Sequence, residues 1–326
     1  MERTKKLKIL VTAIGTASAT AIVTQLNKLK SQIPIYVIGA DIYQRYEVGT
    51  AKFVDEFYQF PSAVEDQEKY YEFLLDFCGQ HNIDYLYSTI DEEVASMCRH
   101  RDELMQAGVV LCNADNETVF LVHDKVRFSR WIAEEFPELH IRTYENIGLV
   151  SKYNLPVFIK PRNGRASMGC MKVSTEEELE RIKHKIDNEQ IVIQDYIQGD
   201  IIVADVIRNR KHKTFKAIQR LEILRNSSGC GIAVKIIDDK RLDKICQNIA
   251  EKLDLNGVVN MEFFKEGDSF KMIEVNPRFS AGTMYTCLAG YDLVKNSLNI
   301  ARGLSCVDEN ITVGGYYAKR YEVIEL

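Results

Sequence analysis

The chain has 326 residues, of which 46% are hydrophobic and 27% are charged, and its formal net charge is −5. This length exceeds what a single hydrophobic core usually supports, so we expect two or three domains. The composition excludes a largely disordered chain, and the acidic balance argues against nucleic acid as a partner, because phosphate backbones are bound by basic surfaces.

The cysteines and the chain start indicate the compartment. Eight cysteines are scattered, without a Cys-x-x-Cys pair or a histidine at metal-ligand spacing, which is typical of reduced thiols. The basic opening MERTKKLK continues as a globular pattern rather than a signal peptide, and no apolar window is long enough to span a membrane. We therefore expect a cytoplasmic protein that has no membrane partner.

The first 115 residues alternate between strand and helix patterns. We expect strands at 7–12, 33–41, 84–89 and 109–113, and helices at 21–30, 66–80 and 92–107. Such alternation predicts an α/β, Rossmann-like domain with a parallel sheet. The turn after the first strand carries only Gly15 and lacks the spaced glycines of a dinucleotide fingerprint, so we interpret it as structural rather than as an NAD site.

From about residue 116 the sequence pattern changes to one typical of an α+β fold. We expect a helix at 124–136, a small unit of strands at 156–161, 171–174 and 190–197 around a charged helix at 175–186, and then a strand-rich region. That region has strands at 201–209, 214–224 and 231–237, a helix at 239–253, a hairpin at 257–276, a helix at 283–302 and a strand near 314–324. The predicted domains are 1–115 and 116–326, the second with a small subdomain at about 125–197 and an antiparallel one at about 198–326.

The stretch SFKMIEVNPRFSAG, residues 269–282, reads as a strand with one unusual face. Glu274, Asn276 and Arg278 fall at every second position and are therefore expected to project from the same side. Ile273 and Val275 would form the opposite, apolar side. Pro277 cannot donate to a sheet ladder, so the strand should end there.

The hairpin partner of this strand supplies a second acid. If the turn centres near Asp268, Glu262 lies directly across from Glu274, where two carboxylates repel unless a cation or a proton intervenes. Magnesium prefers oxygen ligands, so these two acids and the Asn276 carbonyl oxygen make a candidate metal site. Arg278 would stabilise charge on a bound phosphate. The alternative is a polar hairpin face exposed to solvent.

Lys160 ends a strand whose continuation, PRNGRASMGC, contains Gly164, Ser167 and Gly169. Small residues let backbone N–H groups approach phosphate oxygens, and a nearby lysine adds a fixed charge. An ordinary glycine-bearing hairpin turn explains the same loop equally well. Lys125, at the start of the earlier helix, is by itself weaker, because a lone lysine on a helix is usually solvated.

The order of these pieces resembles the ATP-grasp superfamily, particularly the branch related to the carbamoyl phosphate synthase large subunit and to amino-acid ligases. The resemblance is carried by Lys125, IKPRNGRASMGC, VIQDYIQGD, NMEFF and IEVNPRFSAG in succession, and it covers roughly the whole chain. Residues 1–115 would be the pre-ATP-grasp domain and residues 116–326 the grasp itself, with a small lid subdomain.

The resemblance implies roles for individual residues. Both lysines would contact ATP phosphates under a lid loop at 163–169, residues 195–197 would meet the adenine, and Arg278 would be catalytic. Many relatives place a ribose-binding glutamate where this chain has Ile201, so the neighbouring Asp200 is expected to take over. The implied ATP-binding set is Lys125, Lys160, Gly164, Ser167, Gly169, Asp195, Tyr196, Ile197 and Asp200, and the implied metal set is Glu262, Glu274 and Asn276.

Substrate candidates are less well specified. Arg220 and Arg225 suit a carboxylate because a guanidinium can bind it bidentately, although a strand-edge salt bridge is an equally good explanation. Ser280 and Gly282 follow the metal strand, and the loop RNSSGCG at 225–231 could cover a substrate.

These features together predict an ATP-dependent, ADP-forming carboxylate–amine ligase that activates a carboxylate, with an amino-acid-type substrate, as an acyl phosphate. Magnesium, or manganese in its place, would be the metal, and the protein is expected to be a homodimer. A small-molecule kinase on the same scaffold is one alternative, and a non-catalytic ATP-binding sensor is another.

Overall fold

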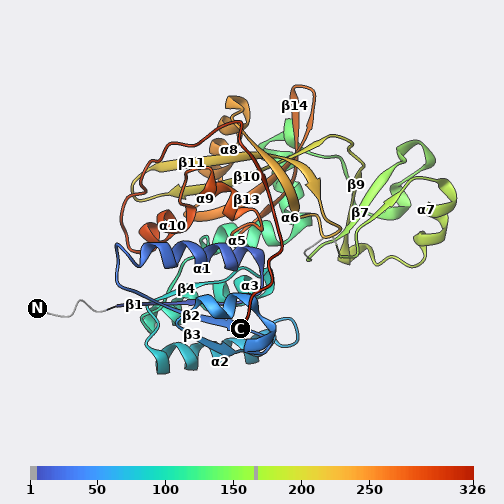
Figure 1. Cartoon of the computed structure of the whole chain (residues 1–326). Helices are drawn as coiled ribbons and strands as arrows, with labels where there is room; N and C mark the ends of the chain where they lie inside the picture. The colour runs from blue at the N-terminus through green and yellow to red at the C-terminus, as the bar shows by residue number, and fades with distance from the viewer. Residues whose placement is uncertain (1–5, 165–167) are drawn as a thin grey trace, which may run out of the picture.

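The computed structural model describes residues 6–164 and 168–326, and its N-terminal part is the expected parallel sheet (Figure 1). The strand order is β3-β2-β1-β4-β5, formed by β1 (Leu7–Val11), β2 (Ile35–Asp41), β3 (Glu56–Gln59), β4 (Tyr85–Tyr87) and β5 (Val110–Leu111). The flanking helices are α1 (Ala17–Leu29), α2 (Gln67–His81), α3 (Asp91–Arg99) and α4 (Arg101–Gln106).

Two local predictions in this part were wrong. The sequence pattern missed β3, because that strand has only four residues and is only partly buried. The single helix expected at 92–107 is two helices, since the non-helical backbone of His100 ends α3 and begins α4.

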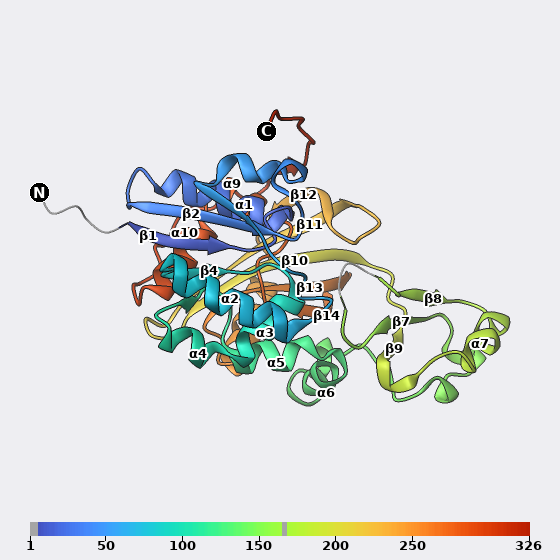
Figure 2. The same cartoon turned by 90° about the horizontal axis from the view of Figure 1, so that it is seen from below.

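The small subdomain is a separate lobe that projects from the rest of the molecule (Figures 1 and 2). Its antiparallel sheet has the order β6-β9-β7-β8, from β6 (Thr143–Tyr144), β7 (Val157–Pro161), β8 (Met171–Val173) and β9 (Ile191–Asp195). Helix α7 (Glu176–Lys183) covers it and begins with a capping box between Thr175 and Glu178. The subdomain has a hydrophobic cluster of its own.

The C-terminal part is an antiparallel sheet with the order β14-β13-β10-β11-β12-β15. Its strands are β10 (Asp200–Asn209), β11 (Thr214–Arg225), β12 (Gly231–Ile237), β13 (Gly257–Glu266), β14 (Ser269–Asn276) and β15 (Tyr316–Ala318), and its helices are α8 (Lys240–Lys252), α9 (Thr283–Leu288) and α10 (Leu293–Ala301). The helix predicted at 283–302 is interrupted at Gly290, whose φ of +115° favours glycine and where a Cβ would lie 2.4 Å from the Asn310 carbonyl oxygen.

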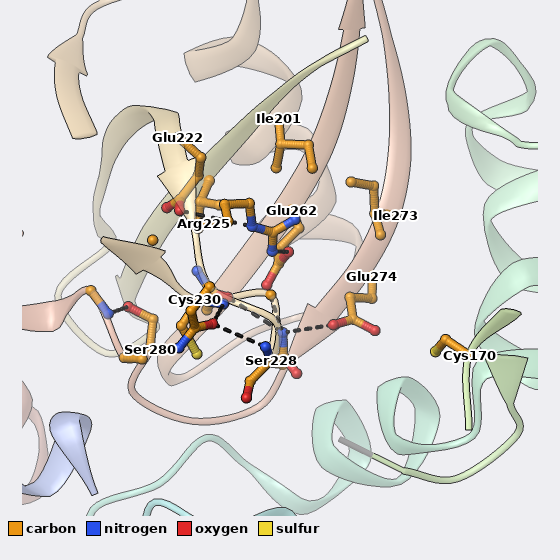
Figure 3. Close-up of a pocket in the computed structure, with 18 of the residues that line it drawn as sticks. Cys170, Ile201, Glu222, Arg225, Ser228, Cys230, Glu262, Ile273, Glu274 and Ser280 are labelled. Carbon is orange, nitrogen blue, oxygen red and sulfur yellow. Dashed lines mark hydrogen bonds and ion pairs between the residues drawn. The ribbon is translucent and has the colours of Figure 1, made fainter. Parts of the chain in front are cut away.

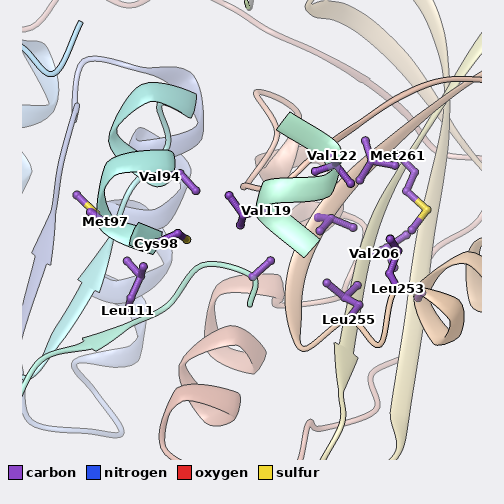
Figure 4. Packing of buried hydrophobic residues seen from close by; sticks show 14 of the residues in the cluster. Val94, Met97, Cys98, Leu111, Val119, Val122, Val206, Leu253, Leu255 and Met261 are labelled. Atoms are coloured by element: carbon purple, nitrogen blue, oxygen red, sulfur yellow. The ribbon is translucent and has the colours of Figure 1, made fainter. Parts of the chain in front are cut away.

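One hydrophobic core runs through both parts of the chain. Helix α5 (Asn116–His123), which was not predicted, lies between them just before α6 (Lys125–Glu135). Val119 and Val122 of α5 belong to a buried cluster that also contains Met97 of α3 and Met261 of β13 (Figure 4). Packing through α5 therefore fixes the two parts relative to each other. No helix in the described ranges is both long and apolar enough to cross a bilayer.

Candidate functional site

A cavity of about 650 Å³ opens between the small subdomain, the C-terminal sheet and the amino end of α1. This volume is typical of small-molecule sites. It brings together most of the predicted site residues, namely Lys125, Lys160, Gly164, Asp195, Tyr196, Ile197, Arg220, Arg225, Glu262, Glu274, Asn276, Arg278, Ser280 and Gly282. Gly169 and Asp200 do not line it, and Ser167 lies outside the described residues.

The predicted pairing of Glu262 with Glu274 is confirmed, but it depends on an irregularity in the hairpin that was not predicted. The hairpin turn sets Glu266 opposite Ser269, a register that would place Ile273 across from Glu262. A β-bulge shifts the register by one residue at that point, and Glu262 pairs with Glu274 instead. A bulge re-aims the side chains that follow it.

The same bulge corrects the prediction for Ile273. Its side chain lines the cavity (Figure 3). Met272 and Val275 instead belong to the buried core cluster. At the bulge, the Ile273 carbonyl oxygen accepts a hydrogen bond of 3.1 Å from Lys160 Nζ. Lys160 is only 8% exposed, and burial lowers the pKa of its ammonium group. Its charge is therefore held at a fixed place in the cavity wall.

The two facing carboxylates are linked by Asn276. Asn276 Nδ2 lies 3.4 Å from Glu262 Oε1 and 3.3 Å from Glu274 Oε1. Burial, and after it the charge of Glu274, raises the pKa of the Glu262 carboxyl to about 7. The amide thus stands between two acids whose mutual repulsion is not fully offset.

This donor set fits a divalent cation. Turning the Asn276 amide about its last bond would direct its oxygen to the same place as the two carboxylates, giving three oxygen donors. No group of three or more His, Cys, Asp or Glu side chains suited to a metal occurs among the described residues. The protein would therefore supply only part of an octahedral shell, as magnesium sites that also bind phosphates do.

Lys125 lies near the same acids. Its Nζ is 4.0 Å from Glu274 Oε2 and donates a hydrogen bond of 2.8 Å to the Gly164 carbonyl oxygen. Asp124 caps α6 and binds Arg162 through two hydrogen bonds of 3.0 and 2.6 Å, so the helix start and the loop are tied together. Lys125 is thus a cavity residue, not a solvated surface lysine.

Gly169 has a structural reason of its own. Its φ is +74°, and an added Cβ would approach Pro161 Cγ to 3.0 Å. The turn therefore requires glycine there for conformation and packing. Because Gly169 does not line the cavity, its predicted contact with ATP phosphates is not supported.

At the strand that leaves the small subdomain, Asp195 has a partner within the protein. Its Oδ1 accepts a hydrogen bond of 2.7 Å from the Tyr144 hydroxyl, and burial together with this bond raises the pKa of Tyr144 to about 12. The ring of Tyr196 lies 3.8 Å below Lys172 Nζ. Backbone groups of residues 195–197 are thus the better candidates for contacts with a base.

Asp200, the predicted ribose-binding acid, does not line the cavity. Asp200 is exposed at the start of β10, and its neighbour Ile201 lines the cavity. Successive side chains on a strand point to opposite faces, so only one of the two can face the cavity. The site therefore has an aliphatic residue where a ribose-binding acid was expected.

Arg220 is a buried member of an ion-pair network. It is 2% exposed and binds Asp205 at 2.9 Å, Glu222 at 3.1 Å and the Ser280 hydroxyl at 3.1 Å. Gly282 lies against its guanidinium, where a Cβ would come within 2.6 Å of Cζ. Ser280 and Gly282 therefore position Arg220, and the salt-bridge explanation of Arg220 is the better one.

Replacing Gly282 by Ala is expected to destabilise the fold by about 1–3 kcal/mol, because the new Cβ overlaps an arginine that three partners hold in place. The measurement is the free energy of unfolding from denaturant titration. Gly79→Ala is a matched control, since no atom lies within 4 Å of its added Cβ in helix α2. The control should be neutral or slightly stabilising; equal losses in both variants would contradict this account.

Arg278 is anchored by a residue that the sequence did not suggest. It binds Asp91 at the start of α3 through contacts of 2.8 and 3.1 Å, and its Nη2 lies 3.4 Å from Asn276 Oδ1. Burial raises the pKa of Asp91, but the charge and hydrogen bonds of Arg278 outweigh it and leave that pKa lowered. The N-terminal domain thus orients an arginine of the candidate metal site.

A second cavity, of about 370 Å³, lies at the carboxyl ends of β1 and β2. Its lining includes Asp41 and Glu93 but, among the residues described, none that is basic. Asp41 Oδ2 accepts a hydrogen bond of 2.8 Å from the Gly15 backbone N–H. A site for a pyrophosphate would need positive charge. These contacts favour the structural interpretation of the Gly15 turn.

The fold and the site define an ATP-grasp architecture, and comparisons with known families agree. A model described as "PylC-like, N-terminal domain" matches residues 9–112, and one described as "ATP-grasp in the biosynthetic pathway with Ter operon" matches residues 187–319. These matches support the assignment of the chain to the ATP-grasp superfamily.

Two curated relatives and one solved structure illustrate the likeness. The arginine-specific large chain of carbamoyl phosphate synthase from Bacillus subtilis is 22% identical over 262 residues, covering 76% of this chain and 25% of the relative. The 3-methyl-D-ornithine–L-lysine ligase of Methanosarcina acetivorans is 25% identical over 129 residues, covering 39% of this chain and 34% of the relative. This chain thus matches a quarter to a third of each relative's length.

The solved structure is the biotin carboxylase domain dimer of Hydrogenobacter thermophilus 2-oxoglutarate carboxylase, in complex with MgADP, ADP and bicarbonate. It matches with a TM-score of 0.75 and 17% identity, covering 96% of this chain and 74% of that chain. At this identity the match establishes the fold alone.

Proposed function

We propose that this protein is an ATP- and magnesium-dependent ligase that forms ADP while joining a carboxylate to an amine. The observation that carries the proposal is the convergence of Glu262, Glu274, Asn276 and Arg278 with two lysines in one cavity. Three oxygen donors can bind a metal ion, and three cationic side chains can bind the phosphates of a nucleoside triphosphate. The relatives named above, which include a synthase and a ligase, support the same class.

The residues divide the work by position. Lys125 and Lys160 would bind phosphate oxygens, and the backbone of residues 195–197 would meet the adenine. Glu262, Glu274 and Asn276 would hold magnesium, or manganese in its place, and the metal when bound neutralises phosphate charge. Arg278, oriented by Asp91, would stabilise the phosphoryl group during transfer.

The proposed chemistry needs no protein nucleophile. A carboxylate oxygen of the substrate attacks the γ-phosphorus of ATP, ADP leaves, and an acyl phosphate remains. The amine then attacks the carbonyl carbon, phosphate leaves, and the nitrogen loses a proton. Such a sequence depends on positioning, charge neutralisation and exclusion of water, which a cavity closed by the small subdomain can provide.

Two alternatives use the same cavity. A small-molecule kinase would stop after phosphoryl transfer, and a sensor would bind ATP without turnover. The full set of Glu262, Glu274, Asn276 and Arg278 in one place favours an enzyme over a sensor, because binding alone does not require an arginine fixed by a buried partner.

The test is to incubate the protein with ATP, magnesium and pools of carboxylic acids and amines, and to measure ADP and phosphate. Release that requires both an acid and an amine is the expected result. ADP with a stable phosphorylated product would favour the kinase, and nucleotide binding without turnover would favour the sensor.

The homodimer also stays a proposal, supported by the dimeric domain among the similar structures. Light scattering during size-exclusion chromatography measures the mass directly. A mass near 37.4 kDa, that of one chain, would contradict it. The cytoplasmic location likewise stays a prediction from the thiol pattern.

A further inference from the structure

A carboxylate in the cavity wall has one oxygen without a partner. Glu222 lies on β11, and its side chain is 3% exposed. Its Oε1 accepts a hydrogen bond from Arg220 Nε at 3.1 Å, whereas its Oε2 has no hydrogen-bond partner. A buried acceptor left unpaired is costly, so in a cavity it indicates a group that a ligand completes.

The nearest cation does not satisfy this oxygen. Arg225 Nε lies 3.9 Å from Glu222 Oε2 and is itself buried without a hydrogen bond. The other end of Arg225 is engaged, because Nη2 lies 3.2 Å from Glu262 Oε2. In Figure 3 the guanidinium of Arg225 stands between the carboxylates of Glu222 and Glu262.

A second cation on the cavity wall is also out of reach. Lys319 lines the cavity, and burial lowers the pKa of its ammonium group. The charge of Glu222 raises that pKa again in part, but Lys319 makes no hydrogen bond to Glu222 Oε2 among the described residues. Glu222 Oε2 is therefore a buried acceptor in a residue of the cavity wall, and no donor among the described residues satisfies it.

Irregular strand pairing creates this arrangement. Residues 222 and 225 are an odd number apart and would point to opposite faces of a regular strand. The register of β11 against β12 shifts between Glu222 and Leu224 and again before Arg225, so both side chains face the cavity. An unpaired acceptor and an unpaired donor thus lie side by side, next to a candidate metal ligand.

We propose that Glu222 Oε2 binds the ammonium group of an α-amino acid, which is the carboxylate substrate of the enzyme. This rests on the proposed ligase function and names the substrate class. The ammonium would donate to Glu222, and the carboxylate would lie against Arg225, toward Glu262 and the phosphoryl group. An ionised acid without an amino group offers only acceptors and leaves Glu222 unpaired.

Gly231 makes room for this carboxylate. An added Cβ at Gly231 would lie 2.0 Å from Glu222 Oε2 and 2.7 Å from its Cδ. Because Arg220 holds the other oxygen, Gly231→Ala would push the acid out of place without removing its charge. It therefore perturbs the position of the carboxylate separately from its chemistry.

Binding is tested by saturation-transfer NMR on the full chain with ADP and magnesium. The probes are pools of L- and D-amino acids, each compared with the acid of the same carbon skeleton that lacks the amino group. At least one amino acid should bind about tenfold or more tightly than its counterpart. Glu222→Gln should abolish the difference, since the Gln oxygen still accepts from Arg220 while an amide N–H₂ faces the cavity.

Gly231→Ala should weaken the binding of the same amino acid. Glu266→Gln, which changes an exposed acid on β13, should leave that binding unchanged. ADP affinity should be unchanged in all three variants, which excludes misfolding. Equal binding of acids with and without the amino group, or a Glu222→Gln variant that keeps the difference, would overturn the proposal.

The assay of turnover separates this proposal from the ligase function. If ADP forms equally well with acids that lack an amino group, the ligase stands and the role of Glu222 falls. If an amino acid binds through Glu222 and no acid elicits ADP, the ligase falls and the binding subsite stands.

Discussion

Glu274→Gln is expected to lower magnesium-dependent ADP release by on the order of 100-fold to 1,000-fold. The variant keeps the size of the side chain but removes one of the two charges that face each other across β13 and β14. Metal binding should weaken with it, whereas ADP measured without metal should bind as in the parent. Initial rates and calorimetric titration of MgADP and of ADP alone supply the comparison.

Glu266→Gln is the matched control for this experiment, because Glu266 is exposed at the turn of the same hairpin. It should retain full turnover. A Glu274→Gln variant that also keeps full turnover would rule out the metal assignment and leave the facing acids as a polar feature of the hairpin.

Arg278→Lys is expected to reduce kcat by on the order of 100-fold, as in Glu274→Gln. Its affinity for ADP should stay within about twofold of that of the parent protein. Lysine keeps the charge but lacks the planar fork that gives Arg278 one hydrogen bond to each Asp91 oxygen, so the cation loses its fixed direction. Asp91→Asn should lower kcat by a smaller factor, because the arginine remains but is held less firmly.

Stability measurements decide between a catalytic and a structural role for this ion pair. Removing one partner of a buried pair typically costs about 3–5 kcal/mol, so unfolding is monitored in both variants. Arg241→Lys, in an exposed pair with Asp268, is the control. Variants that are destabilised but turn over normally would show that Arg278 only ties the two domains together.

Much of the fold was predictable because its signals are local. The alternating pattern of the first 115 residues gave the parallel sheet, and the apolar strand runs after Gly199 gave the antiparallel one. The two elements that the sequence pattern missed have physical explanations. Strand β3 is short and half-exposed, and α5 is a short helix whose burial comes from elements far away in the sequence. The apolar residues of α5 form no sequence pattern that would indicate a helix packed between two domains.

Part of the candidate site was likewise predictable from local sequence patterns, and part was not. The alternation of Glu274, Asn276 and Arg278 and the hairpin around Asp268 were sufficient to place two acids opposite each other. The sequence did not indicate that Ile201 rather than Asp200 lines the cavity, because the face of a strand that meets a cavity depends on packing. Arg220 was a candidate for substrate binding, but its pairs with Asp205 and Glu222 turn it inward.

By itself, the sequence determined which residue types carry the chemistry and which strands carry them, since periodicity and turn residues act over a few positions. The tertiary structure alone decided the rest. The bulge beside Ile273 set Glu274 opposite Glu262, and the irregularity after Glu222 brought Arg225 to the same cavity as that acid. The contact between Arg278 and Asp91 spans 187 positions. Such pairings depend on which side chains meet when the core packs, and no local pattern encodes that.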